Sequence, residues 1–516
     1  MKATDFLTIL GIGLAVWALI PRKERKFILL FFSKFHFFLL ITSILFLHYL
    51  FSFYWLADNW FPALHIFITP KGIPSSTWAY IFSIFIVAFP VIKVLYGFFA
   101  PSRKEKLIEL YKSQIKDNDI DLLVEYINKY HINDIILYLK GLSTLSEKSN
   151  VDFLMHRRTQ ADIEYKKLVK PIRIKFGATV YGRILQNGDF VKKVSVKYPE
   201  LLAKAFSGME TEKAANESLV KLFIECIFES KNQSFISELK IINKNDVSIE
   251  EWNKDYEMPI LYGLLAHTKA AAKNYVWYPV GEKTVKSLKH DKAQIEFLRK
   301  KYDHDIVSEL WNYKAYIGIV YFNYMVRETI YKDSGWHMWL YYYRHFTVLL
   351  TELIPEENDY DHEQENPSFA HHLIVEMIWN MRDWLELSKE ENKDYQIIDT
   401  IKCLGNCIVI LCFAPTIKIS KSFKIRQLDL IISLWFKYTE YPENDATKLA
   451  KEWLIKMFLN PKNVDWGQPD LSNESYKSIL SETWEKFDKI PYNDGFEEGS
   501  SIKQFKEEVL TPLQIN

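Results

Sequence analysis

The chain has 516 residues, enough for two or three domains, with 65 basic and 65 acidic side chains. Its 17 glycines and 18 prolines make turn-forming residues scarce, which argues against sandwiches, barrels and propellers and favours long helices. Four cysteines in a chain of this length exclude a disulfide-stapled secreted scaffold.

The N-terminal hundred residues contain three apolar stretches, at 6–20, 37–56 and 78–100. A bilayer core requires about 20 apolar residues, so the second and third stretches are long enough to cross it and the first is marginal. A signal peptide carries positive charge before its apolar run, whereas here the basic cluster 22–26 follows the first stretch. The sequence therefore predicts a transmembrane domain with three spans over residues 1–100.

Basic residues are unevenly distributed around these stretches. They gather at 22–26 and again at 103–106, whereas the loop between the second and third stretches contains only Lys71. Because cytoplasmic loops are enriched in Lys and Arg, we expect the N-terminus outside and residues 101–516 in the cytoplasm. The predicted location is the inner membrane of a bacterial-type cell, as a multi-pass protein with the lipid bilayer as its first partner.

Polar positions within or beside the apolar stretches bear on oligomeric state. Lys34, His36, His48 and Lys93 lie there. Such side chains are unfavourable where they face lipid, and contact between copies of the chain would bury them. We therefore expect a homo-oligomer, with a passive membrane anchor as the alternative.

The remainder of the chain shows apolar residues at helical spacing, for example Leu123 and Ile127. No fixed repeat period recurs, which favours an irregular array of helices over a regular solenoid. We divide it into a helical cytoplasmic domain at 101–355, a helical C-terminal part at 356–490 and a loosely ordered acidic tail at 491–516. The fold class expected is mainly α, with N-terminal transmembrane helices followed by a large irregular α-helical cytoplasmic domain.

One segment departs from helical spacing. Apolar residues alternate in places over residues 172–197, around the sequence Gln186-Asn187-Gly188-Asp189. Asn-Gly between apolar runs is typical of a two-residue hairpin turn. A small β-hairpin is therefore predicted here, and a helix pair joined by an Asn-Gly turn is the alternative.

The same region is strongly basic. Residues 156–197 contain eleven Lys or Arg and three Asp or Glu. A basic patch can bind anionic lipid headgroups or another phosphate-bearing ligand, and it can also be a solvated face that pairs with the acidic remainder of the molecule. The residues that we assign to ligand binding are Arg157, Arg158, Lys166, Lys167, Arg173, Lys175 and Arg183.

Residues 311–346 form an aromatic block with thirteen Phe, Trp or Tyr side chains. Aromatic residues interleaved with Lys314, Arg327 and Arg344 can stack on nucleobases. Such a block is also typical of a helix-packing core, because aromatic side chains bury large areas. Cys403, Cys407 and Cys412 lie in an apolar segment, where buried free thiols are expected.

A cluster of Asp, His and Glu residues at 359–376 contains the candidate metal ligands. His372 and Glu376 are four residues apart and so share a helix face, and Asp361 precedes them. Carboxylate and imidazole groups in this arrangement can hold a metal ion. The cluster lacks a known spacing signature such as H-E-x-x-H, and an acidic loop before a capped helix also explains it.

No Walker loop, glycine-rich dinucleotide motif or nucleophile elbow occurs, so neither catalytic residues nor a cofactor are assigned. The sequence predicts a membrane-anchored cytoplasmic helical binding or sensor protein that acts as an oligomeric membrane effector, with an unidentified protein partner. The alternative is a membrane-tethered metal-dependent hydrolase or nuclease that uses the 359–376 cluster.

Overall fold

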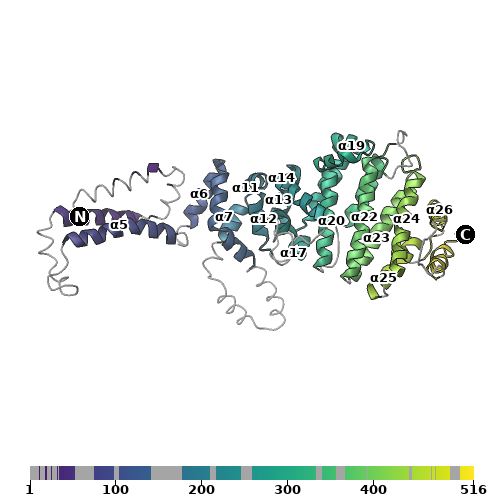
Figure 1. The fold of residues 1–516 in the computed structure, drawn as a ribbon. Helices are drawn as coiled ribbons and strands as arrows, with labels where there is room; N and C mark the ends of the chain where they lie inside the picture. The colour runs from purple at the N-terminus through teal and green to yellow at the C-terminus, as the bar shows by residue number, and fades with distance from the viewer. Residues whose placement is uncertain are drawn as a thin grey trace. The chain divides into compact units, whose positions relative to one another are not determined.

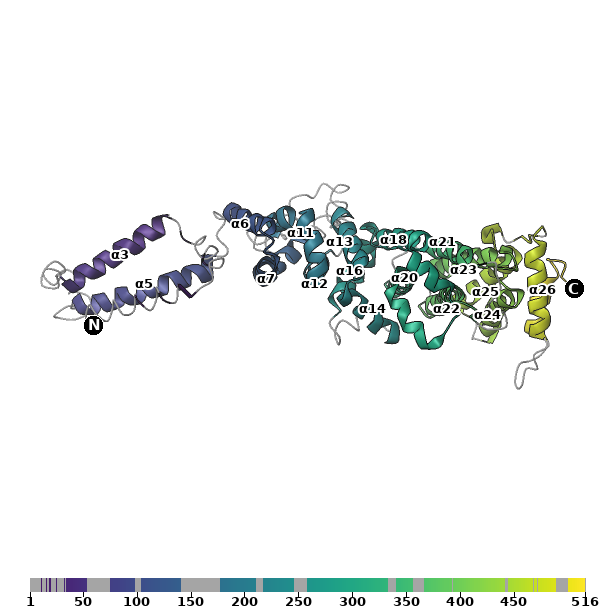
Figure 2. The same ribbon diagram turned by 90° about the horizontal axis from the view of Figure 1, so that it is seen from above.

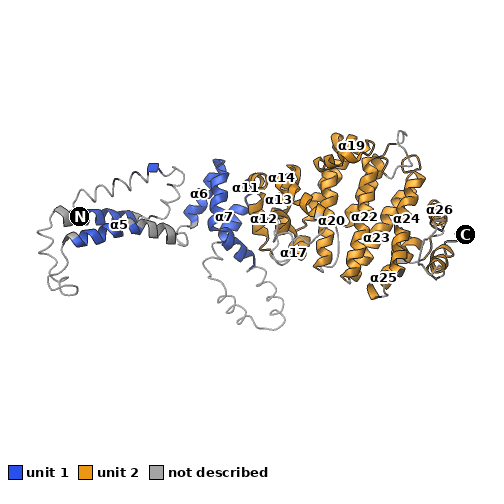
Figure 3. Ribbon diagram, in the orientation of Figure 1, with its two compact units in different colours: residues 1–141, 147–190 blue, residues 142–146, 191–516 orange. Residues whose placement is uncertain are grey.

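The computed structural model is helical throughout the part that it describes (Figure 1), which confirms the mainly-α expectation. Within this part no strand occurs, and the single β-bridge joins Lys301 to Ser368. The chain divides into two compact units, residues 1–141 with 147–190 and residues 142–146 with 191–516 (Figure 3). The described residues are 11, 15, 18, 19, 25, 32, 34–52, 75–97, 104–140, 177–209, 217–245, 258–332, 340–355, 366–391, 393–440, 444–466, 468–470, 472–488 and 500–515.

The first unit contains a pair of apolar helices, α3 (Lys34–Ser52) and α5 (Ser75–Gly97), which lie side by side (Figure 2). The pair is antiparallel, because the start of one helix meets the end of the other. His36 stacks on Phe89 with 5.9 Å between ring centroids, and Phe46 meets Phe82 at 5.0 Å. Leu47 is fully buried in their interface. Most of the predicted stretch 6–20 lies outside the described residues.

The first unit also contains α6 (Lys104–Lys116), α7 (Ile120–Tyr130) and a π-helix, η3 (Tyr181–Leu185), and α6 packs against both of the others. The helical spacing read from the sequence is confirmed in α7, where Leu123 and Ile127 are fully buried.

The predicted β-hairpin is wrong over the residues that the structure describes. Tyr181–Leu185 is a π-helix and Gly188–Lys197 is an α-helix, α11. The side-chain oxygen of Asn187 accepts a hydrogen bond of 3.0 Å from the backbone N–H of Phe190. Asn187 therefore caps a helix instead of forming a hairpin turn. Phe190 and Val194, which are four residues apart, are both fully buried, so the apolar pattern has helical spacing here.

The second unit is an array of helices that follow one another in chain order (Figure 1). Helices close in sequence pack together, as in the pairs α18–α20, α22–α23 and α24–α26. After α11, the α-helices are α12 (Pro199–Phe206), α13 (Glu217–Glu229), α14 (Gln233–Asn245), α16 (Pro259–Leu265), α17 (Thr268–Lys273), α18 (Trp277–His290), α19 (Lys292–Arg299), α20 (Lys314–Tyr331), α21 (Leu340–Leu353), α22 (Phe369–Glu390), α23 (Asp394–Phe413), α24 (Lys421–Glu440), α25 (Asp445–Leu459) and α26 (Glu474–Asp488).

Helix α23 lies in the core of the second unit, in contact with α21, α22 and α25. Among the described residues it alone is both long enough and apolar enough to cross a membrane, judged by length and composition. However, 61% of its apolar window is buried inside the protein. Cys403, Cys407 and Cys412 are buried free thiols along this helix or near its end, as predicted. Burial among helices explains the composition of α23 without a membrane.

The C-terminal end differs from the loosely ordered tail that its acidic composition predicts. Residues 500–515 form α27 (Ser500–Phe505), the π-helix η7 (Lys506–Leu510) and a final turn. Phe505 and Val509 are fully buried, and Phe505 stacks on Trp484 of α26 with 5.0 Å between ring centroids. A few apolar residues at helical spacing are enough to dock this segment despite its acidic composition.

Candidate functional site

Of the seven residues assigned to ligand binding, the structure describes one. Arg183 lies in η3, and its guanidinium forms an exposed ion pair with the Glu105 carboxylate of α6. Binding of a ligand by the segment therefore stays a prediction. The other six residues of that assignment lie outside the described residues: Arg157, Arg158, Lys166, Lys167, Arg173 and Lys175.

The predicted pair His372 and Glu376 lies on one face of α22. Ser368 caps this helix, because its hydroxyl accepts a hydrogen bond from the backbone N–H of His371. Nε2 of His372 is 3.6 Å from Oε2 of Glu376, and about a fifth of each side chain is exposed, 19% and 21%. Asp361 lies outside the described residues. In the described part of the chain, no group of three or more His, Cys, Asp or Glu side chains is placed to hold a metal ion.

Two further residues complete a polar chain at this site. The hydroxyl of Tyr316, in α20, donates a hydrogen bond to the Glu376 carboxylate and accepts one from the side-chain amide of Asn243, in α14. Sequence reasoning placed Tyr316 in the aromatic block but did not connect it to Glu376, and it did not single out Asn243. Three helices distant in sequence supply these groups, so no spacing pattern reveals the chain.

Aromatic side chains line the site. The ring of Tyr302 lies 4.8 Å from that of His372, centroid to centroid, and Trp311 meets Tyr316 edge-on at 4.9 Å. The segment that carries Tyr302 is held against the start of α22 by the backbone N–H of Phe369, which donates to the Lys300 carbonyl at 3.2 Å. This packing shields most of the surface of the pair from water.

Burial moves the two titrating groups of the site in opposite directions. It raises the pKa of Glu376 to about 7, although the hydrogen bond from Tyr316 partly opposes this. Burial and, to a smaller extent, the nearby His304 together lower the pKa of His372 to about 4. At neutral pH His372 is therefore neutral, while Glu376 exchanges its proton. A carboxyl group tuned in this way can donate or accept a proton, which is the chemical capacity of this site.

The stability of the protein is expected to depend on pH through Glu376. Its folded-state pKa of about 7 lies above the ordinary value of 4.5, so the folded state holds the proton more tightly. The free energy of unfolding therefore falls as the pH rises from 4.5 to 7. Glu376→Gln keeps a neutral hydrogen-bonding group and removes this loss of stability at high pH. The free energy of unfolding of the variant, relative to that of the wild type, should therefore be about 2 kcal/mol higher at pH 8 than at pH 4.5.

The measurement is thermal unfolding of the detergent-purified wild type and the Glu376→Gln variant at both pH values. His372 contributes a slope of opposite sign, because its lowered pKa makes the unfolded state bind more protons below pH 6.5. That slope is present in both proteins and largely cancels in the comparison, because burial and His304, not Glu376, lower the pKa of His372. If the difference in stability between wild type and variant were the same at both pH values, the raised pKa of Glu376 would be contradicted.

The described members of the aromatic block form a packing core. Tyr321, Phe322, Tyr343 and Phe346 are fully buried, and Phe322 contacts Phe346 edge-on at 5.8 Å. Tyr341 differs, with 62% of its surface exposed. The block is thus explained by helix packing over these residues and leaves little ring surface for bases to stack on.

Comparisons with known proteins do not assign the chain to a family. No family model, curated protein or solved structure matches it. The features of the chain that bear on its function are the apolar helix pair of the first unit and the polar side chains of the second unit.

Proposed function

We propose that the chain is a membrane-anchored helical binding protein, in which α3 and α5 cross the bilayer and the second unit binds a ligand or partner in the cytoplasm. The observation that carries this proposal is the apolar outer surface of the α3–α5 pair. The large apolar side chains on this surface are between 40% and 66% exposed: Phe35, Phe37, Phe38, Ile41, Leu45, Tyr80, Ile81, Ile84 and Phe85. A surface of this kind is unfavourable in water and favourable in lipid.

The dimensions of the pair fit a bilayer. At about 1.5 Å per residue, the 19 residues of α3 and the 23 residues of α5 extend about 28 and 35 Å. The hydrocarbon core of a bilayer is about 30 Å thick. Backbone hydrogen bonds within each helix leave few main-chain groups to satisfy in lipid. The full helix lengths and the exposed apolar side chains therefore support insertion of both helices, whereas the apolar stretches described within them, Phe35–Tyr49 and Thr77–Ile86, are each shorter than a full span.

The charges of the pair support an orientation. Neither helix contains an acidic residue, and their lysines are Lys34, at the start of α3, and Lys93, near the end of α5. Because the helices are antiparallel, both lysines lie at the same end of the pair. Basic residues favour the cytoplasmic side, so this end faces the cytoplasm and the loop that contains Lys71 lies outside. This is the inner-membrane, multi-pass topology expected from the sequence, with residues 101–516 in the cytoplasm.

Self-association is the second part of the proposal. The imidazole of His36 stacks on Phe89 within the pair. No helix among the described residues covers the apolar outer surface of the α3–α5 pair. Either lipid or a second copy of the pair can cover this surface. We propose a homo-oligomer in the membrane, through which ligand binding in the second unit is coupled to assembly.

Reporter fusions test the topology. Fusions after Lys26 and after Lys106 should give cytoplasmic signals, and a fusion near Lys71 should give an external signal, because the basic residues on either side hold those loops inside. The control is a fusion after Phe413, at the end of the buried helix α23, which should read cytoplasmic if α23 does not cross the membrane. A cytoplasmic signal near Lys71 would overturn the proposed arrangement of spans.

A further inference from the structure

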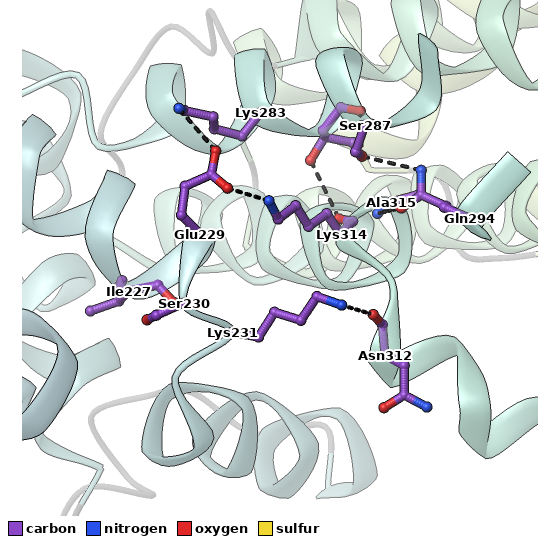
Figure 4. A network of polar contacts seen from close by, with 11 residues as sticks. Ile227, Glu229, Ser230, Lys231, Lys283, Ser287, Gln294, Asn312, Lys314 and Ala315 are labelled. Atoms are coloured by element: carbon purple, nitrogen blue, oxygen red, sulfur yellow. Dashed lines mark hydrogen bonds and ion pairs between the residues drawn. The ribbon is translucent and has the colours of Figure 1, made fainter. Parts of the chain in front are cut away.

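Four lysines of the second unit gather around one end of α13 and form what we call the lysine cluster: Lys192, Lys231, Lys283 and Lys314. They come from α11, from the turn after α13, from α18 and from α20, respectively. The sequence does not group them, because they are spread over more than one hundred residues. Packing of the helices brings them together, and Figure 4 shows the last three around Glu229.

Glu229 lies at the centre of the lysine cluster. It is the last residue of α13, and its two carboxylate oxygens are shared between two lysines. Oε1 is 2.9 Å from Nζ of Lys283, and Oε2 forms an ion pair with Lys314. Burial raises the pKa of Glu229, but the hydrogen bonds from Lys314 and Lys283 outweigh it, so the pKa lies below its ordinary value. The carboxylate is therefore a charged anion held between two cations.

The cluster has more positive than negative charge. Lys192 is exposed and, among the described residues, makes no ion pair. The positive charges of Lys192 and Lys283 both act to lower the pKa of the Cys226 thiol, although burial outweighs them and raises it. The acidic groups beside them are Glu225 and Glu229. Lys283 and Lys314 share Glu229, while Lys192 and Lys231 form no ion pair with a described residue, so the positive charges outnumber the negative ones and attract anions.

The backbone at Lys231 adds a second observation. Its φ angle of 48° is left-handed, in the turn where the N–H of Asn232 bonds the carbonyl of Ile227 at 3.0 Å. Glycine is the usual residue in this helix-ending turn, and a lysine costs about 1 kcal/mol more. The ammonium of Lys231 donates to the Asn312 carbonyl at 2.6 Å, next to the start of α20 (Figure 4). The strained position therefore places a third cation close to Lys314.

The start of α20 strengthens the local positive potential. Lys314 is the first residue of this 18-residue helix, and Tyr313 before it provides no side-chain cap. The N–H of Ala315 is instead bound by the buried side chain of Gln294 at 3.1 Å, which fixes the first turn. The positive end of the helix dipole thus coincides with the lysines, which favours an anion there.

We propose that the lysine cluster binds the phosphate group of a ligand, and that Glu229 occupies this site as an internal anion when the ligand is absent. The inference rests on the binding function proposed above and names its ligand class. A phosphate group has a charge of about −1.5 to −2 and three acceptor oxygens, so it can bridge several ammonium groups better than one carboxylate does. Lysines bind phosphate as point charges, without the planar geometry that arginine imposes.

Calorimetric titration of the full-length protein in phosphatidylcholine nanodiscs tests the proposal. The probes are inorganic pyrophosphate, for a soluble phosphate compound, and a short-chain phosphatidic acid, for a lipid headgroup. Glu229→Gln should bind at least one probe about fivefold more tightly than the wild type, because the internal competitor is neutralised. Lys283→Gln combined with Lys314→Gln should weaken that binding by about 20-fold or more.

Lys289→Gln is the matched control, because Lys289 is exposed on the same helix as Lys283 and makes no ion pair with any described residue. This variant should bind within about twofold of the wild type, since only a distant charge is removed. Preference for pyrophosphate or for the lipid identifies the source of the phosphate, and either preference supports the site. Absence of binding in wild type and Glu229→Gln, or equal loss in the double variant and the control, would overturn it. If binding fails in this way while the reporter fusions give the expected topology, the phosphate site is rejected and the proposed membrane anchor is retained.

Discussion

Replacing Gly263 by alanine is expected to destabilise the second unit by about 3 kcal/mol or more. Gly263 lies in α16, and the added Cβ atom would be 2.1 Å from the carbonyl oxygen of Ala203 in α12. The same atom would be 2.6 Å from the carbonyl carbon. These are backbone atoms, so no side-chain rotation relieves the clash and the two helices must move apart. Their close packing depends on the missing side chain of the glycine.

Thermal unfolding of the detergent-purified protein checks this expectation. The matched control is Gly182→Ala, since a Cβ atom at that helical position would meet nothing within 4 Å. The control should be neutral or stabilising by up to about 1 kcal/mol, because alanine has the higher helix propensity. Shortening Ala203 to glycine should not rescue Gly263→Ala, because the clashing oxygen belongs to the main chain. A wild-type melting temperature for Gly263→Ala would show that α12 and α16 are not in this contact.

Much of the helical architecture could be predicted from local patterns. The spacing of Leu123 and Ile127 follows directly from the helical period, and scarce glycine and proline left few places for strands to turn. The hairpin prediction failed because Asn-Gly has two uses. An asparagine that bonds the backbone N–H of Phe190 starts a helix, whereas the same dipeptide with positive φ angles closes a hairpin. The local sequence does not distinguish a helix cap from a hairpin turn. The helix is favoured because it buries both Phe190 and Val194.

The polar clusters could be predicted only in part. His372 and Glu376 are one helical turn apart, so their contact was predictable from spacing. The groups next to Glu376 were not, because Tyr316 bonds Glu376 and Asn243 bonds Tyr316 only through the packing of three helices. The same holds for the lysine cluster, in which Lys283 and Lys314 pair with Glu229 from two helices that are distant in sequence. Sequence reasoning found local charge density at residues 156–197, whereas the folded chain concentrates charge from distant positions.

The membrane anchor makes the other large prediction. Leu45 and Ile84 lie near the middle of α3 and α5, where 63% and 52% of their surfaces are exposed. The double substitution Leu45→Asp with Ile84→Asp places two carboxylates at the centre of the proposed spans. Each costs about 3 kcal/mol for insertion. The variant should therefore fail to integrate and should be released from membranes by alkaline carbonate, whereas the wild type should remain.

Val196→Asp is the matched control for that experiment. Val196 lies on α11 of the second unit and is 52% exposed, so the same apolar-to-charged change there occurs outside the proposed spans. The control should integrate like the wild type. An apolar surface is favourable in lipid, but it is also favourable in a contact between copies of a water-soluble protein. Comparing the double variant with the control distinguishes these two environments. If the surface instead served contact between copies of a water-soluble protein, carbonate would extract the wild type as well. The two aspartates would then increase the solubility of the variant without changing its location. Extraction of the wild type, or retention of the double variant, would therefore show that α3 and α5 do not span the membrane.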